Sequence, residues 1–254
     1  MTRSAGSPRA ASQDWKTEIL RLTVFQGTGQ TPFDPSGWWQ AIAGVSPEST
    51  VTKSRTGERV ESGPFGGGVL VLQTQPGRGD WLLLEPPEMA EPFAELRFPE
   101  ATETFRDALR TWLEDRPNVA RLALGAIVKL PVDDREAGYR RISDYLPFDV
   151  DPVTSSDFLY QINRARQSTV LPAVRVNRLS KWSVGRLVRA AVIPDQIPLT
   201  LSLHEVPQSS SCRLELDINT STDSPFPLPN ARLPALFDEF VDWAREIISE
   251  GDIQ

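Results

Sequence analysis

The chain contains one cysteine, Cys212, and one histidine, His204, and this scarcity excludes several kinds of site. A disulfide within the chain needs two cysteines, so none can form, which fits a reducing cytosol. A zinc site built mainly from cysteine and histidine is excluded for the same reason. Strand alternation places Cys212 and His204 on opposite faces, so they cannot act together as a nucleophile and its base. Cys212 is expected to be a buried, unreactive thiol.

Long apolar runs are also missing from the sequence. No run approaches the roughly 18–20 residues that a membrane-spanning helix needs, so no membrane association is expected. Residues 1–14 are mostly small and polar and lack the apolar core of a signal peptide, so we expect them to be a disordered tail. Together with the single cysteine, these absences predict a cytoplasmic protein.

The sequence contains partial matches to catalytic and ligand-binding motifs, and each lacks residues that the motif requires. Three glycines at residues 66–68 precede a predicted strand rather than a helix, and no Gly-Lys-Ser/Thr follows, so they do not form a phosphate-binding loop. A calcium-loop pattern that starts at Asp217 has Thr222 in place of glycine and Leu228 in place of glutamate. No Gly-x-Ser-x-Gly elbow occurs. We therefore expect a protein that is not an enzyme and holds no cofactor and no metal.

What the chain does contain is a succession of strand and helix patterns. Alternating apolar and polar residues predict a strand over 18–25 and hairpins over 51–62 and 68–85. Apolar residues at helical spacing predict helices; these are expected over 101–115, 133–146 and 233–248, with a short one over 37–43. Further strands are predicted over 119–131, 173–179, 185–193, 199–206 and 212–219. We expect the last two to pair as an antiparallel hairpin covered by the closing helix.

Runs of antiparallel strands that are each closed by a helix indicate an α+β fold. We expect two strand-rich halves with antiparallel sheet packed by amphipathic helices, forming a single domain over residues 15–254. The halves would meet near residues 116–118. One interpretation is that they are pseudo-repeats, although no repeat is visible at the level of individual residues.

One stretch of the sequence lacks acidic residues altogether. Between Phe158 and Pro194 there are seven basic residues and no Asp or Glu, although the chain as a whole carries a formal charge of −7. Such a separation creates a local positive field that could hold an anion, a nucleic acid or an acidic partner. We call these seven residues the basic island: Arg164, Arg166, Arg175, Arg178, Lys181, Arg186 and Arg189.

The basic island has two interpretations, and the sequence leaves both open. In the first it is a binding surface, because an amide beside a guanidinium suits carboxylate or phosphate recognition. The candidate binding residues are then Arg164, Arg166, Arg175, Asn177, Arg178, Lys181 and Arg189. In the second, Arg175 and Asn177 share a polar sheet face with Glu215 and Asp217, and cross-strand pairs neutralise the island internally.

Tryptophan is concentrated in the first half of the chain. Trp38 and Trp39 are candidate binding residues too, because large aromatic side chains are favoured at the centre of protein interfaces. One hypothesis is therefore a non-catalytic interaction protein whose partner is another protein, bound through the polar sheet face and this tryptophan-rich half. The alternative is an anion- or nucleic-acid-binding protein that uses the basic island. The net charge of −7 makes nucleic acid the less favoured partner.

The order of elements resembles that of a sporadically distributed family of uncharacterised bacterial proteins of about this length. The resemblance rests on the opening strand over 19–25, on Leu124 and Gly125 after the mid-chain helix, and on the strand over 214–219 before the final helix. It implies an accessory component of a mobile or antiviral defence locus in a bacterium. It supplies no catalytic residues.

Overall fold

The computed structural model describes residues 14–27, 29, 33–86, 95–116, 118–186, 191–192, 201–202, 210–223 and 227–252. Several of the residues considered above lie outside these ranges. They are almost all of the expected disordered tail, Arg189, the side chain of Arg186, His204, and most of the strand predicted over 199–206.

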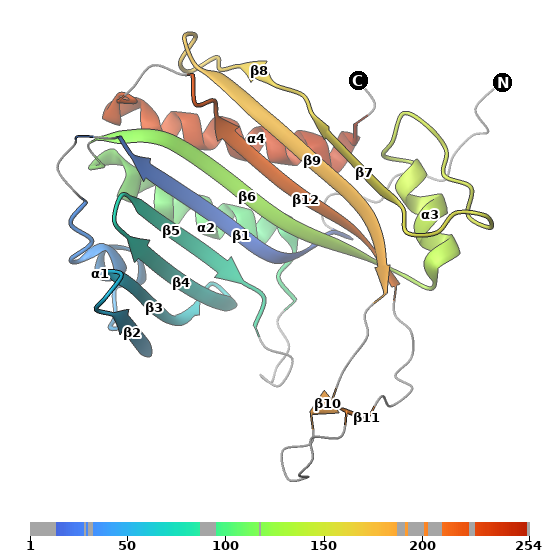
Figure 1. Cartoon of the computed structure of the whole chain (residues 1–254), viewed down its shortest axis with the longest axis horizontal. Coiled ribbons are helices and arrows are strands. Elements are labelled where there is room, and N and C mark those ends of the chain that lie inside the picture. Colours follow the sequence, from blue (N-terminus) through green and yellow to red (C-terminus); the bar gives the residue numbers. More distant parts are fainter. Residues whose placement is uncertain are drawn as a thin grey trace.

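Ten strands form one large antiparallel sheet, which dominates the molecule (Figure 1). Their order is β2-β3-β4-β5-β1-β6-β12-β9-β7, and β8 pairs with β9. Two more strands, β10 and β11, pair with each other in a separate small sheet. The strands are β1 (Lys16–Gln26), β2 (Ser49–Lys53), β3 (Glu58–Phe65), β4 (Gly68–Gln75), β5 (Arg78–Leu84), β6 (Val119–Val132), β7 (Leu159–Asn163), β8 (Arg166–Gln167), β9 (Arg175–Arg186), β10 (Ala191–Val192), β11 (Leu201–Ser202) and β12 (Ser210–Thr220).

Two long helices, α2 (Phe98–Glu114) and α4 (Leu233–Glu250), lie side by side on one face of the sheet (Figure 1). Each has proline in its first turn, where the missing N–H costs nothing. The short helix α1 (Trp38–Ala43) contacts α2, and α3 (Arg135–Ser143) packs near the end of β6, β9 and β12. None of the helices in the described part of the chain combines the length and the hydropathy that crossing a membrane requires.

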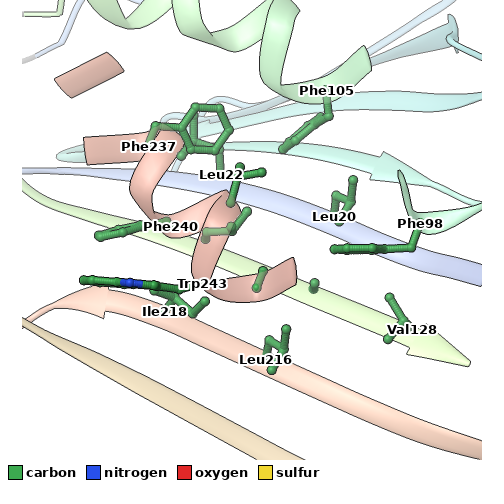
Figure 2. Packing of buried hydrophobic residues seen from close by; sticks show 14 of the residues in the cluster. Leu20, Leu22, Phe98, Phe105, Val128, Leu216, Ile218, Phe237, Phe240 and Trp243 are labelled. Carbon is green, nitrogen blue, oxygen red and sulfur yellow. The ribbon is translucent and has the colours of Figure 1, made fainter. Parts of the chain in front are cut away.

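The core lies between the sheet and the two long helices (Figure 2). Alternate residues of the central strands point toward it, and the apolar stripes of α2 and α4 complete it because a stripe of period 3.6 faces one side. Each fully buried side chain contributes roughly 1.5–3 kcal/mol relative to leaving it exposed. Members shown in Figure 2 are Leu20, Leu22, Phe98, Phe105, Val128, Leu216, Ile218, Phe237, Phe240 and Trp243.

The α+β class predicted from the sequence is confirmed by this antiparallel sheet with its helices. The two early hairpins and the helices over 101–115 and 233–248 were also predicted within a few residues. The strand predicted over 173–179 instead continues in β9 to Arg186, because Ser180, Lys181 and Trp182 continue its alternation. Of the strand predicted over 185–193, residues 185–186 belong to β9, residues 191–192 form β10, and the others lie outside the described residues.

The predicted pairing of residues 199–206 with 212–219 is wrong. β12 lies between β6 and β9, so that Leu216 is opposite Ala126 on one side and Ser180 on the other. Of residues 199–206, the structure describes only β11, which pairs with β10. Alternation along a strand specifies which residues share a face, but it does not specify the neighbouring strand.

Candidate functional site

The described part of the basic island lies on β9 and on the chain before it, and its side chains leave the sheet on both faces. Arg178 points to the same side as the core residues Val176 and Trp182 and is almost fully buried. Arg175 and Lys181 alternate with these residues and point to the opposite side. The island is therefore not one continuous basic surface.

Glu246 of α4 neutralises two of the island arginines. Arg178 donates from Nη2 to Glu246 Oε1 at 3.1 Å, and its guanidinium lies 5.5 Å from the centre of the Trp243 ring. Arg166 binds both oxygens of the same carboxylate, at 2.8 and 2.6 Å. Burial lowers the pKa of Arg178, and the nearby charge of Arg166 lowers it further, while Glu246 opposes the change. A buried guanidinium is tolerated here because it is paired.

Asp252, just after α4, holds the third arginine. Arg164 donates to both of its carboxylate oxygens, and the Tyr160 hydroxyl donates to Oδ2 at 2.6 Å. The hydrogen bond from Arg164 to Asp252 raises the pKa of Arg164. Between these groups is a pocket with room for about one water molecule. It is lined by Arg164, Arg178, Ser180, Ile247, Gly251 and Asp252.

The residues of β9 on the other side of the sheet are bound to neighbouring strands. Lys181 pairs with Glu215 of β12 at 3.2 Å. Asn177 donates to Asn219 at 3.1 Å and accepts from Asn163 at 3.0 Å. Such cross-strand contacts match the internal interpretation of the island, in which polar residues of β9 and β12 share a face.

The acids that bind three of the island arginines were not predicted from the sequence. Glu215 and Asp217 were the predicted partners, and Glu215 does pair with Lys181, but Arg164, Arg166 and Arg178 are paired with Asp252 and Glu246. The sequence does contain a pattern that could have indicated these acids. Glu239, Trp243 and Glu246 are spaced at i, i+4 and i+7, which places them on one face of α4. Glu239 accepts hydrogen bonds from the Ser168 and Thr169 hydroxyls, at 2.5 and 2.6 Å, so this face holds the segment before β9.

Trp38 and Trp39, proposed as interface residues, are buried within the chain itself, each with 4% of its surface exposed. Trp38 meets Trp112 of α2 edge to face, with ring centres 4.9 Å apart, and Trp39 lies against Trp81 of β5. Gly79 makes this possible, because an added Cβ there would lie 2.6 Å from the Trp38 ring. These tryptophans therefore stabilise the core and offer no contact area to a partner.

A different surface is left open by the fold. We call the side of the sheet opposite α2 and α4 the open face; in the described part of the chain no helix lies on it (Figure 1). At its centre, strands β4, β5, β1 and β6 place aliphatic residues directly opposite one another. The six half-buried side chains form what we call the aliphatic patch: Ile19, Val69, Val71, Leu82, Leu84 and Ile127.

The remaining candidates for chemistry are a cluster of metal-ligating side chains and the Cys212 thiol. Among the described residues, no cluster of three or more His, Cys, Asp or Glu side chains is arranged to hold a metal ion. Cys212 is buried on β12 and donates to the Gly138 carbonyl at 3.4 Å. Burial raises the pKa of its thiol to about 12.

Comparisons of this chain with protein families, with curated proteins and with solved structures each found no match. The resemblance to a bacterial family noted from the sequence therefore stays a prediction.

Proposed function

We propose that this chain is a non-catalytic accessory protein of the bacterial cytosol that binds another protein through the open face of its sheet. The aliphatic patch is the observation that carries this proposal. Contiguous apolar surface on a folded domain commonly marks a site of interaction. The accompanying hypothesis, that the chain serves a mobile or antiviral defence locus, rests on the resemblance described above.

The register of the sheet makes the aliphatic patch continuous. Leu84 is opposite both Val69 and Ile19, and Ile19 is opposite Ile127, so one apolar row crosses four strands. A second row begins with Val71 and Leu82. Cross-strand neighbours on one face have Cβ atoms about 4.5–5.5 Å apart, so the two rows form a single surface. A partner that covered this surface would remove the remaining apolar area from water.

The alternative function, binding of an anion or a nucleic acid by the basic island, has less support. Arg164, Arg166, Arg178 and Lys181 each have a carboxylate partner within the chain. A phosphate would have to displace Asp252, Glu246 or Glu215, and the loss of those hydrogen bonds opposes binding. We therefore favour a protein partner.

The proposal is tested by capture from the native host with a matched control. A tagged wild-type chain is compared with a Val71→Asp/Leu82→Asp variant, which charges the aliphatic patch, and with Val45→Asp/Val153→Asp. Val45 and Val153 are exposed elsewhere, at 60% and 71%. Quantitative mass spectrometry should show a protein retained by the wild type and the control but lost by the patch variant. Equal capture by all three folded proteins would contradict the proposal.

We also propose that the two halves of the chain are pseudo-repeats. Each half opens with a strand (β1 or β6) that pairs with the last strand of the same half (β5 or β12), and a long helix follows. The β1–β6 pair joins the halves. Co-expression of residues 1–116 and 117–254 as separate chains should then yield a stable complex; two insoluble fragments would contradict this organisation.

A further inference from the structure

Four basic side chains on the open face are paired with carboxylates. The pairs lie within one strand, between neighbouring strands, or across one intervening strand, so this part of the surface carries little net charge. They are Arg78 with Asp80, Lys129 with Glu85, Arg213 with Glu18, and Lys181 with Glu215. Arg121 on β6 has no carboxylate partner either, but it donates hydrogen bonds to the Thr220 carbonyl and to Asn219. Arg21 differs from all of these, because among the described residues it has no ion pair and no side-chain hydrogen bond.

Arg21 occupies the middle of this face. It lies on β1 between the core residues Leu20 and Leu22, opposite Leu82 on β5 and Gly125 on β6. Its guanidinium rests over Gly125, where an added Cβ would lie 3.3 Å from both Nε and Nη2. Asp217, beyond Gly125 on β12, accepts a hydrogen bond from Asn219 and makes no ion pair with Arg21 in the described structure. The cation is therefore held at the edge of the aliphatic patch.

We propose that Arg21 binds a carboxylate of the protein partner, and that the partner segment carries Asp or Glu beside aliphatic residues. This inference rests on the proposed function. A guanidinium can bind a carboxylate through two parallel hydrogen bonds, and such a bond is stronger where water is excluded. A partner with only apolar residues would bury Arg21 without a counter-charge, which is costly. The same residue therefore favours acidic partners and rejects neutral ones.

The spacing on the open face restricts the shape of the partner. Neighbouring strands lie about 4.8 Å apart, so Leu82 and Val71 are roughly 5 and 10 Å from Arg21 along one row. Helix residues three or four positions apart have Cβ atoms about 5–6 Å apart. A helix with an acid followed by aliphatic residues at that spacing fits this row.

Two other occupants fit the surface less well. A second copy of the chain, docked about a two-fold axis near Arg21, would bring together two arginines that have no acidic partner in the described part of either chain. A nucleic acid would meet Asp217 beside Arg21. Among the described residues, Arg78, Lys129, Lys181 and Arg213 are already paired with carboxylates, so little positive charge remains on this face for phosphate.

The experiment selects ligands without assuming a partner. A random peptide library displayed on phage is selected on the wild-type chain, and enriched peptides are labelled with a fluorophore for polarisation assays. We expect them to carry an acid beside aliphatic residues. Arg21→Gln should weaken binding at least about tenfold, since removing one partner of a desolvated charge pair leaves the other charge buried and unpaired. Arg55→Gln, in the exposed turn after β2, is the matched control and should leave affinity unchanged.

A double-mutant cycle then tests the contact itself. Replacing the peptide acid by its amide should weaken binding to the wild type but have little further effect on the Arg21→Gln variant, because the two groups act together. Arg21→Lys, which keeps the charge but not the paired hydrogen bonds, should give an intermediate affinity. Thermal unfolding of each variant shows that the fold is retained.

The outcomes separate this inference from the proposed function. Loss of binding with Leu82→Ser but not with Arg21→Gln would keep the aliphatic patch as a docking site and overturn the role of Arg21. Binding that neither variant changes would overturn both. Failure to enrich acidic peptides also contradicts the inference. Two other results would also contradict the inference: a dimer seen by light scattering, or binding of an oligonucleotide, if either is lost in the Arg21→Gln variant. Each would assign Arg21 to a different occupant.

Discussion

On β1, Leu20, Leu22 and Val24 face the helices and are almost fully buried, whereas Ile19 and Arg21 on the same strand face outward and are half-buried. The two faces of the sheet also differ in whether a basic side chain is paired within the chain. Arg178, on the helix side, is paired with Glu246 and stacked on Trp243. Arg21, on the open face, has no such partner among the described residues.

This difference follows from what each face requires. A charge on the covered face cannot be solvated, so the chain itself must supply the counter-charge. A charge on the open face is solvated until something covers it, so its partner can come from another molecule. Substitutions on the covered face should therefore reduce the free energy of unfolding, and those on the open face should reduce binding alone.

The largest loss of stability is expected from Phe237→Ala on the covered face. Phe237 is fully buried between α4 and the sheet, and truncation of a buried aromatic side chain costs about 3–5 kcal/mol. Urea denaturation measures the change. Val153→Ala, at a side chain that is 71% exposed, is the control and should change the free energy of unfolding by less than about 0.5 kcal/mol. A Phe237→Ala effect below about 1 kcal/mol would contradict the packing.

The reactivity of the Cys212 thiol tests whether the same face is buried. Its pKa, raised from 9.0 to about 12 by burial, leaves roughly a thousandfold less thiolate near neutral pH, and the thiolate is the reacting form. A thiol reagent should therefore modify the native protein far more slowly than the urea-unfolded protein. The neutral thiol is favoured in the folded state, so this contribution to stability is present below pH 9 and is lost as pH rises toward 12. Equal labelling rates in both states would place Cys212 at the surface.

Glu246→Gln should have a smaller but clear effect. It removes the negative charge shared by Arg166 and Arg178 and leaves the buried Arg178 without an anionic partner, which we expect to cost about 2 kcal/mol. Glu250→Gln, at the exposed end of α4, is the control and should be nearly neutral. Equal midpoints for the two variants in urea denaturation would show that the pairing does not stabilise the fold.

Arg21→Gln should have the smallest effect on stability. The side chain has no polar partner to lose within the described structure, so the expected change is within about 0.5 kcal/mol. Urea denaturation beside Arg55→Gln measures it. A loss above about 1 kcal/mol would show that Arg21 supports the sheet and would weaken the contrast between the two faces.

Much of the local structure could be predicted because periodicity reports directly on burial. The α4 stripe and the β4–β5 hairpin are examples, since their side chains alternate with the period of the element. The place of β12 between β6 and β9 could not be predicted, because many strand orders satisfy the same alternation. The pairing of the basic island with α4 could not be predicted for the same reason. Glu246 is 80 residues from Arg166, and only the final packing of α4 brings them together.

Residue type was a poor guide to interfaces. Trp38 and Trp39 suggested a binding surface, yet the same size and apolar area suit a core, and α1 carries both into it. The sequence does not distinguish Arg21 from other residues, because it lies in an ordinary alternating strand. Its distinctive property is that it has no polar partner among the residues that the structure describes, and this depends on the neighbours that β5, β6 and β12 supply.

Gly125 controls how far the Arg21 charge stands from the sheet. A Cβ added at that position would lie 3.3 Å from Nε and Nη2 of Arg21, so the guanidinium would have to shift, and we expect it to move outward, toward bulk water. Water would screen the charge more strongly there, and the attraction for a carboxylate would fall. One methyl group on β6 could thus adjust the affinity of a cation on β1 while leaving Arg21 itself unchanged.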